Sequence, residues 1–189
     1  FLNGSMHRLY DDLAPWWLLL SPPELFDEEA ARIRRWLGSG SLLELGSGAG
    51  LLASQLDGEV ELLDQAPAML EVSRSLNPGR PHHALDMRSA RLGRTFSAVL
   101  LHDAVMYLLT EEDLRATYQT AWNHLEPGGR LLVLPDFCAE DFEEHTVGGG
   151  GEDDDRAIRL LEWHWAADDG TVHVEMSVVL REGQRLPHL

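Results

Sequence analysis

The chain has 189 residues, of which 15 are basic and 32 acidic, so its formal net charge is −17 with histidine neutral. This length suits one domain with a sizeable core, and the hydrophobic content of 44% is that of a globular protein rather than a disordered one. A chain this acidic repels polyphosphate backbones, so the composition excludes a general nucleic-acid-binding function.

All 15 basic residues are arginine, and the absence of lysine excludes Schiff-base chemistry and a P-loop lysine. The single cysteine, Cys138, excludes an internal disulfide and a cysteine-based zinc site, which suits a reducing cytoplasm. The longest apolar runs, such as Trp16–Leu20, are far too short to span a membrane, and the chain does not begin like a secretory signal. We therefore expect a cytoplasmic protein with no membrane partner. Residues 1–5, ahead of Met6, resemble a remnant of cloning and are left out of the predicted fold.

Segments with helical and strand patterns alternate along the first 135 residues. Apolar residues recur at helical spacing over residues 24–37, with Trp36 among the expected core residues, and Gly38 ends that helix. Thr110, followed by Asp113 three residues later, indicates the capped start of another helix. In chain order we predict a helix over 24–37, a strand over 41–45, a short helix over 51–56, a strand over 60–63, a helix over 66–76, strands over 83–85 and 96–101, a helix over 110–125 and a strand over 130–134.

This alternation with short connections predicts an α/β core over residues 6–135. The expected architecture is a doubly wound, mostly parallel sheet with helices on both faces and right-handed crossovers.

The remaining residues, 136–189, have a different pattern. Between Leu131 and Asp155 there are nine acidic residues, no arginine and four consecutive glycines, which predicts a mobile acidic loop. Beyond it, apolar and polar residues alternate on both sides of the turn signal Asp168-Asp169-Gly170. This pattern predicts a β-hairpin over residues 160–180, inserted after strand five.

Closely spaced glycines follow the first predicted strand, in Glu44-Leu45-Gly46-Ser47-Gly48-Ala49-Gly50. A strand, such a loop and then a helix allow a ligand to approach the backbone closely. Asp64 ends the next strand, where a carboxylate can accept both hydroxyls of a ribose, and Asp86 follows the third. Because an open α/β sheet binds its ligand at the carboxyl ends of its strands, these residues predict one ligand site. The alternative for each aspartate is a simple strand-end cap.

At these motifs the sequence resembles the class I S-adenosylmethionine-dependent methyltransferases of the small-molecule type. The resemblance covers roughly residues 8–135, and the tail resembles a bacterial subgroup of these enzymes at residues 156–165 and 179–182. The segments that carry it, in chain order, are 44–50, 63–70 (where Gln65 and Ala66 replace the usual pair), 84–87, 101–107 and 125–129.

The resemblance implies S-adenosyl-L-methionine as the cofactor and S-adenosyl-L-homocysteine as its product. Gly46, Gly48 and Gly50, with Ser47 between them, are expected to let the backbone pass the methionine part of the cofactor. Glu44 is expected to organise this loop or to bind the ammonium group of the methionine part.

The other implied roles belong to the nucleoside and to the mouth of the site. Asp64 is expected to bind the ribose, with Gln65 beside it. Met69 is expected to pack on the adenine, or else to be plain core. The expected contacts of the adenine amino group are the Asp86 carboxylate and the Met87 backbone. His102 is expected to line the methionine end, unless it is a structural histidine, and Tyr10 to cover the cofactor, unless it is a core aromatic.

The implied reaction moves a methyl group in line to N or O of a small or medium organic acceptor. The methyl of a sulfonium cation is already activated, so alignment could supply on the order of 7–11 kcal/mol. Removal of the acceptor's proton by a general base adds about 10²–10⁴-fold, and His102, Asp103 and His145 are the candidate bases. Trp163, His164 and Trp165 of the hairpin either form a roof that selects the acceptor or only pack the hairpin.

Two other functions stay open on the sequence alone. One is a non-enzymatic domain that only binds S-adenosylmethionine, and the other is a nicotinamide-dependent reductase, which the absence of a Tyr-x-x-x-Lys pair disfavours. We predict no metal, because His82-His83 has no third ligand at suitable spacing. Only nine residues follow Leu180, too few for the family's last two strands. Either a C-terminal portion is missing from this sequence, or the sheet ends early with strand five near an open edge, which would allow a homodimer.

Overall fold

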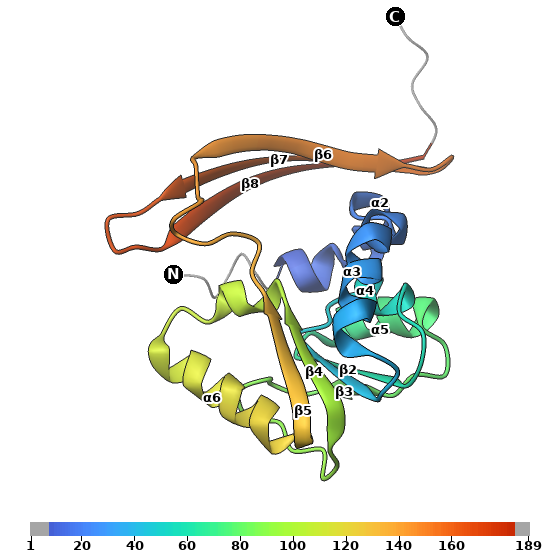
Figure 1. Cartoon of the computed structure of the whole chain (residues 1–189). Coiled ribbons are helices and arrows are strands. Elements are labelled where there is room, and N and C mark those ends of the chain that lie inside the picture. Colours follow the sequence, from blue (N-terminus) through green and yellow to red (C-terminus); the bar gives the residue numbers. More distant parts are fainter. Residues whose placement is uncertain (1–7, 184–189) are drawn as a thin grey trace, which may run out of the picture. The chain divides into compact units, whose positions relative to one another are not determined.

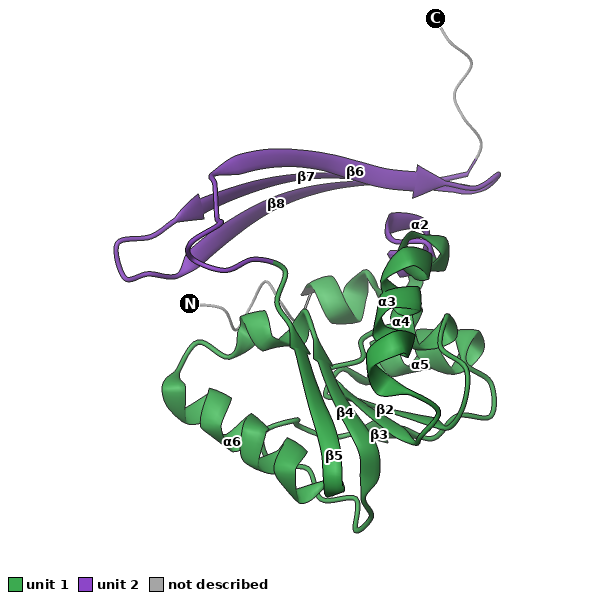
Figure 2. Ribbon diagram, viewed as in Figure 1, with its two compact units in different colours: residues 1–15, 23–136 green, residues 16–22, 137–189 purple. Residues whose placement is uncertain are grey.

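The computed structural model describes residues 8–183, which form two compact units (Figures 1 and 2). One unit consists of residues 8–15 and 23–136, and the other of residues 16–22 and 137–183. Residues 1–5, predicted to be a remnant of cloning, lie outside the described part. Among the helices of residues 8–183, none combines the length and the apolar character that crossing a bilayer requires.

The first unit is built on a five-stranded sheet with the order β3-β2-β1-β4-β5 (Figure 1). All neighbouring strands are parallel, which confirms the predicted architecture. The central strand is entirely buried, as expected when helices cover both faces of a parallel sheet. The strands are β1 (Leu42–Leu45), β2 (Val60–Asp64), β3 (His82–Ala84), β4 (Phe96–His102) and β5 (Leu125–Leu134).

Helices pack on the two faces of this sheet through separate apolar clusters. The longer helices are α3 (Asp27–Leu37), α5 (Pro67–Leu76) and α6 (Glu111–Asn123); the shorter helical turns are η1 (Arg8–Asp12), η2 (Ala14–Trp16), η3 (Pro23–Phe26), α4 (Leu51–Ser54) and η4 (Ala104–Tyr107). One cluster joins the buried sides of α3 and α4 to alternate residues of the strands, such as Leu62 and Leu100. The other joins Ala121 of α6 to residues of the opposite face, such as Leu43 and Val99.

Two helix ends lie where their sequence signals predict them, but one residue predicted to lie in the core is exposed. The Thr110 side chain accepts a hydrogen bond from the Asp113 N–H at 3.1 Å, and Gly38 ends α3 at φ 70°. Trp36, however, is 66% exposed, so its predicted core position is wrong. The buried positions Ala30 and Ile33 define the inner side of α3, and the 3.6-residue period turns position 36 away from it.

Strand β5 pairs with β4 in two stretches. Leu125 lies opposite Phe96, the register then shifts, and regular pairing resumes with Arg130 opposite Ala98. The intervening residues contain the predicted Pro-Gly-Gly turn, and Gly128 has a φ of 84°. Within residues 8–183, β5 is an edge strand of the sheet.

The second unit contains a three-stranded antiparallel sheet, β6-β7-β8, and the short helix α2 (Trp17–Leu20). The predicted hairpin is confirmed as β7 (Arg156–Ala166) and β8 (Val172–Glu182). The turn between them is closed by the Thr171 carbonyl, which accepts from the Ala167 N–H at 2.8 Å.

The predicted mobile acidic loop is wrong for residues 145–152, because these form the strand β6 (His145–Glu152). All four glycines pair with β7, from Gly148 opposite Leu161 to Gly151 opposite Ile158. A Cβ at Gly150 would stand 2.1 Å from the Ile158 carbonyl oxygen, and one at Gly151 2.1 Å from the Leu19 carbonyl oxygen. The glycines therefore allow close backbone approach within this unit rather than a mobile loop.

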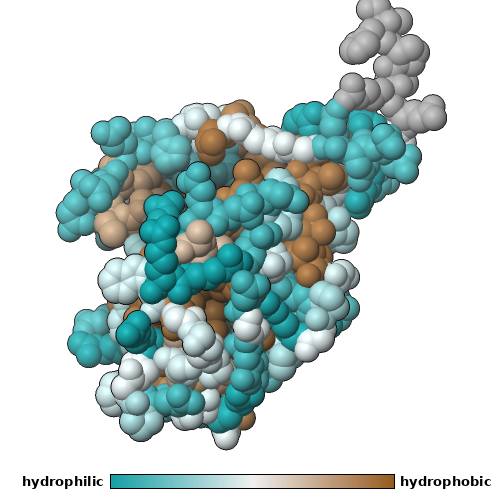
Figure 3. Space-filling model, turned by 45° about the vertical axis from the view of Figure 1, so that its right-hand side comes forward, coloured by the Kyte–Doolittle hydropathy of each residue, from teal (hydrophilic) through white to brown (hydrophobic). Residues whose placement is uncertain are grey.

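The surface is mixed in character. On the face shown in Figure 3, hydrophilic side chains cover most of the molecule, and smaller hydrophobic patches lie between them. Large apolar side chains that remain mostly exposed include Leu25, Trp36 and Trp122. Scattered exposure of this kind is ordinary and by itself marks no site.

Candidate active site

The glycine-rich loop between β1 and α4 lies at the carboxyl end of the sheet. Gly46, Gly48 and Gly50 have φ values of 71°, 53° and 67°, a backbone region that favours glycine. A Cβ at Gly46 would stand 2.2 Å from the Ala104 Cβ, so packing alone requires glycine there. At Gly48 a Cβ would meet only the Met69 Cε, at 3.6 Å. The middle of the loop is therefore open enough for a ligand to approach the backbone.

Glu44 projects from β1 behind this loop and is only 3% exposed. Its Oε2 atom is buried without a hydrogen-bond partner, and so is the Ser47 hydroxyl. Burial raises the pKa of Glu44 to about 8, with the charges of Asp64 and Asp103 adding to the effect and Arg80 opposing it. Two buried polar atoms without partners are unusual in a folded protein, and they mark a place that a polar ligand would complete.

Asp64 ends β2 and holds the loop in place. Its Oδ2 accepts the Gly48 N–H at 2.7 Å, and its Oδ1 accepts the Ala66 N–H at 2.8 Å. Burial raises the pKa of Asp64, while backbone N–H groups, including that of Gln65, oppose the rise. Each carboxylate oxygen has a second lone pair, so Asp64 keeps accepting capacity for a ligand hydroxyl.

The predicted adenine-side residues surround the same loop. Met69 is buried with its Cε beside Gly48, and the Met87 sulfur would lie 3.7 Å from a Cβ at Gly46. Asp86, in contrast, is engaged: the Arg88 side chain donates to both of its oxygens, at 3.0, 3.0 and 2.6 Å. A ligand amino group must therefore share the Asp86 carboxylate with Arg88.

The end of β4 brings a histidine and several carboxylates together. The His102 Nε2 lies 3.1 Å from the Glu29 Oε2 and 3.3 Å from the Asp103 Oδ1. Asp136, which follows β5, also acts on Asp103. Burial, followed by the interaction with Asp136 and the charge of Glu29, raises the pKa of Asp103 to about 8. The structure thus places the two predicted bases His102 and Asp103 side by side.

Tyr10 lies in this unit against Tyr107 of η4. The two hydroxyl groups are hydrogen-bonded, and the rings meet edge to face with their centroids 6.0 Å apart. Burial raises the pKa of Tyr10, and the charges of Asp64 and Asp136 add to the rise. Tyr10 therefore belongs to the same electrostatic environment as the glycine loop, whereas its covering role stays a prediction.

His145, the third predicted base, belongs to the second unit. Its ring stacks on His164 with centroids 4.4 Å apart, and its Nδ1 lies 2.8 Å from the Glu143 carbonyl oxygen. His164 in turn lies 2.9 Å from a Glu162 carboxylate oxygen. The structure does not place His145 with His102 and Asp103 in one unit.

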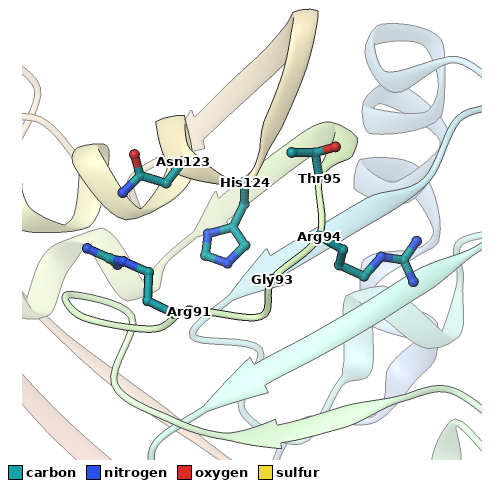
Figure 4. A pocket seen from close by; sticks show the side chains of 6 residues that line it. All are labelled: Arg91, Gly93, Arg94, Thr95, Asn123 and His124. Atoms are coloured by element: carbon teal, nitrogen blue, oxygen red, sulfur yellow. The ribbon is translucent and has the colours of Figure 1, made fainter.

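A cavity of about 340 Å³ opens at the amino end of the same sheet, away from the glycine loop (Figure 4). It is lined by Arg91, Gly93, Arg94, Thr95, Asn123 and His124. Both nitrogens of His124 already have partners, the Leu92 N–H at 3.0 Å and the Thr120 carbonyl oxygen at 2.7 Å. Arg94 is paired with Glu59 and Glu61. Because His124 and Arg94 are already paired within the protein, this cavity is a weaker candidate site than the loop.

The sequence prediction missed Glu29, Asp136 and the pairing role of Tyr107. Asp136 had a usable signal, because it follows strand five at the edge where the other site residues gather. Glu29 lies in the first turn of α3 and had no such signal, since only tertiary packing brings it to His102.

Comparisons with known proteins agree with this geometry. Residues 43–133 match a family described as a methyltransferase domain. The chain is 36% identical over 113 residues to a dTDP-3-amino-3,4,6-trideoxy-alpha-D-glucopyranose N,N-dimethyltransferase of Streptomyces venezuelae, an alignment that covers 58% of this chain and 48% of that protein. It is 33% identical over 126 residues to a dTDP-3-amino-3,6-dideoxy-alpha-D-glucopyranose N,N-dimethyltransferase of Streptomyces fradiae, covering 64% and 49%. The chain thus spans about half the length of the curated relatives it matches.

Solved structures give the same assignment. The crystal structure of DesVI from Streptomyces venezuelae aligns with a TM-score of 0.70 and 26% identity, over 92% of this chain and 83% of that one. An amino pentose methyltransferase from Micromonospora echinaspora, solved with S-adenosylmethionine bound, aligns with a TM-score of 0.66 and 27% identity, over 84% and 77%. Together with the glycine loop and the strand-end carboxylates, these matches show that residues 43–133 form a methyltransferase domain with the fold of the class I S-adenosylmethionine-dependent enzymes.

Proposed function

We propose that the protein transfers a methyl group from S-adenosylmethionine to the amino group of a small sugar nucleotide. The observation that carries this proposal is the buried Glu44 carboxylate, whose Oε2 has no partner beside an open glycine loop. An unpaired buried carboxylate calls for a cation or a strong donor, and this cofactor carries both an ammonium and a sulfonium charge. The curated relatives, named as N,N-dimethyltransferases of dTDP-linked amino sugars, support nitrogen as the methylated atom.

The residues at the loop fit this cofactor. The open side of Gly48 would admit the methionine part, with Glu44 and the Ser47 hydroxyl as its partners. Asp64 would accept the ribose hydroxyls with its remaining lone pairs, and Gln65 follows it at the same edge. Gly46 and Gly50 would shape the loop around the ligand.

The nucleoside end has a matching set of side chains. Met69 and Met87 would pack against the adenine, since both border the loop. Asp86 would take the adenine amino group in competition with Arg88. His102 would line the methionine end from the last position of β4, and Tyr10, hydrogen-bonded to Tyr107, would cover the site.

When bound, S-adenosylmethionine supplies a methyl group that a sulfonium sulfur has already activated. The chain's own contribution is then to fix the donor on the loop, to exclude water and to hold the acceptor nitrogen in line, which is worth on the order of 7–11 kcal/mol. An acceptor amine also has to be in its neutral form, because an ammonium ion has no lone pair to donate. His102 and Asp103 are the candidate groups for taking this proton.

Calorimetric titration tests the cofactor site. We expect micromolar binding of S-adenosylmethionine and S-adenosylhomocysteine and no binding of NADH. Asp64→Asn keeps the size and one acceptor oxygen of the side chain, and we expect it to weaken binding at least tenfold. Asp154→Asn removes the same charge from an exposed position of the second unit and should bind like the parent chain.

Turnover tests the reaction itself. Incubation with S-adenosylmethionine and dTDP-3-amino-3,4,6-trideoxy-alpha-D-glucopyranose, the compound in the relative's name, should yield S-adenosylhomocysteine and a sugar heavier by one and then two methyl groups. Binding of the cofactor without transfer to any amino sugar would favour the non-enzymatic binding domain instead. Tight binding of NADH with no affinity for S-adenosylmethionine would favour the reductase.

Three smaller expectations stay predictions. They are the cytoplasmic location, the homodimer, and the selection of an acceptor with an apolar body by Trp163, His164 and Trp165. Alanine variants of the two tryptophans with unchanged acceptor affinity would refute the last of these.

A further inference from the structure

The helix α4, which follows the glycine loop, is too short to be stable by itself. It has four residues, and isolated helices shorter than about 12–15 residues are marginal in water. Gly50 precedes it with a left-handed backbone, φ 67° and ψ 30°, and has no side chain that could cap the first turn. Other parts of the chain must therefore fix this helix and the loop before it. The connection between α5 and β3, residues 77–82, does so, and we call it the clamp.

The clamp holds both ends of α4. At the amino end, the Asn77 Nδ2 donates to the Gly50 carbonyl at 2.9 Å. At the carboxyl end, the Arg80 guanidinium donates to the carbonyl oxygens of Ala53 and Leu56. Because these bonds reach backbone atoms on both sides of the helix, the clamp determines where the glycine loop ends.

The clamp is itself tied together inside the first unit. Asn77 is only 3% exposed, and its backbone N–H donates to the Ser73 carbonyl at 2.7 Å. The buried Ser73 hydroxyl lies 2.9 Å from the His82 Nε2, and the His82 Nδ1 lies 2.8 Å from the Arg80 carbonyl oxygen. These bonds join the two ends of the clamp into one network, so Asn77 and Arg80 cannot move independently of each other.

The glycine loop is thus held at two points. Asp64 accepts the Gly48 N–H at 2.7 Å, and Asn77 donates to the Gly50 carbonyl two residues later. Between these points lies the open side of Gly48, where the only atom near an added Cβ is the Met69 Cε. A backbone fixed on both sides of an open position is preorganised for a ligand.

The Asn77 Oδ1 is buried without a hydrogen-bond partner. An unsatisfied buried oxygen lowers stability, so stability alone does not favour an asparagine at this position. What the amide does provide is a donor aimed at the Gly50 carbonyl. Local rules of this kind are broken mainly at functional sites, which points to a role in placing the loop.

We propose that Asn77 and Arg80 are positioning residues of the cofactor site, which fix the backbone of Gly48 and Gly50 in the conformation that admits S-adenosylmethionine. This inference rests on the proposed function and deepens it, because it assigns two residues that act on the cofactor through the loop. A loop released from the clamp occupies the binding conformation only part of the time. The apparent affinity then falls by that fraction.

Arg80 also acts through its charge, which opposes the rise in the pKa of the buried Glu44 carboxyl. A variant that keeps the charge separates this effect from the hydrogen bonds. Arg80→Lys does so, since an ammonium group on a flexible stem lacks the planar fork that reaches the Ala53 and Leu56 carbonyls together.

Calorimetric titration with S-adenosylhomocysteine tests the proposal without relying on turnover. We expect Asn77→Ala to bind about tenfold more weakly and Arg80→Lys about threefold more weakly, as lost hydrogen bonds to the loop and helix predict. Thr117→Val is the control: its hydroxyl is equally buried and donates to the Asp113 carbonyl at 2.9 Å, but within α6 on the opposite face of the sheet. It should lose stability in urea unfolding and bind S-adenosylhomocysteine like the parent chain.

Nuclear magnetic resonance gives a signature that a purely structural role would not produce. We expect the amide signals of Gly48 and Gly50 to broaden in Asn77→Ala, while those of α6 keep the parent's line widths. Saturation with S-adenosylhomocysteine should restore the two signals, because the ligand selects the binding conformation. Arg80→Lys is the smaller change and decides the test should Asn77→Ala fail to fold.

The outcomes separate this inference from the proposed function. Parent-like affinity in the folded clamp variants would overturn the positioning role and leave the cofactor site intact. An equal loss of affinity in Thr117→Val would also overturn it, since affinity would then simply follow stability. A parent chain that binds neither S-adenosylmethionine nor S-adenosylhomocysteine would overturn the proposed function and this inference with it.

Discussion

Substitution of Gly50 by alanine should destabilise the first unit more than substitution of any open glycine. Gly50 sits in the left-handed region, with φ 67° and ψ 30°, where an alanine costs about 1–2 kcal/mol. A Cβ at this position would stand 2.2 Å from the Ser73 Oγ, 2.6 Å from the Asn77 Nδ2 and 2.9 Å from the Leu62 Cδ2. All three distances are too short for real atoms, so the neighbours must move.

Those neighbours have little freedom to move. The Ser73 hydroxyl lies 2.9 Å from the His82 Nε2, and the Asn77 Nδ2 donates to the Gly50 carbonyl at 2.9 Å. Overpacking of a core costs about 1–3 kcal/mol, and any lost hydrogen bond adds to it. The backbone and packing costs together predict that Gly50→Ala lowers the free energy of unfolding by about 2–5 kcal/mol.

Gly93→Ala is the matched control. Gly93 has nearly the same φ, 71°, but a Cβ there meets nothing within 4 Å. Both variants share the left-handed backbone cost and the same change in the unfolded chain, so their difference isolates the packing cost. Urea unfolding followed by circular dichroism measures both free energies. Equal losses in the two variants would refute the argument that Ser73, Asn77 and Leu62 require glycine at position 50.

Further predictions concern the loop, a helix cap and pH. Gly48→Ala should lower S-adenosylmethionine affinity at least tenfold in calorimetry, and unchanged affinity would mean that the ligand does not approach this backbone. The same variant should cost no more stability than Gly93→Ala, because its Cβ meets only a methionine methyl at 3.6 Å. Thr110→Ala should cost about 1 kcal/mol in urea unfolding, since it removes the N-cap of α6, and a negligible loss would contradict the cap. Glu44 has a folded pKa of about 8 against an ordinary 4.5, so the folded state retains a proton that the unfolded state releases between those values. Stability should therefore fall as pH rises through this window, by up to about 1.4 kcal/mol per unit, and urea titrations of Glu44→Gln at several pH values should show a shallower fall.

The sequence was sufficient for the features that depend on local pattern. Short apolar runs predicted the parallel strands, because a strand buried on both faces needs no alternation. The three glycines of the loop predicted a tight strand-to-helix connection, and Thr110 predicted a helix start to the residue. In each case the residues that decide the structure are neighbours in the chain.

Features decided by distant partners were missed. Residues 145–152 combine four glycines with acids, a composition with little preference for a strand, and they become β6 because each residue pairs with β7. Trp36 was assigned to the core on its hydrophobicity, although Ala30 and Ile33 already define the buried side of its helix. Glu29 reaches His102 only through the packing of α3 on the sheet.

The raised pKa of Glu44 affects both the stability of the fold at high pH and the binding of the proposed cofactor. At pH 7 a carboxyl group with a pKa of about 8, such as Glu44, is ionised in only about one molecule in ten. A cationic ligand that needs the ionised form therefore binds about tenfold more weakly than its contacts allow, and its affinity rises about tenfold for each pH unit up to 8. The same burial that costs stability at high pH thus makes cofactor affinity dependent on pH. S-adenosylmethionine titrations from pH 6 to pH 8 should show this rise in the parent chain and not in Glu44→Gln, whereas a flat profile in both would mean that Glu44 does not hold the cation.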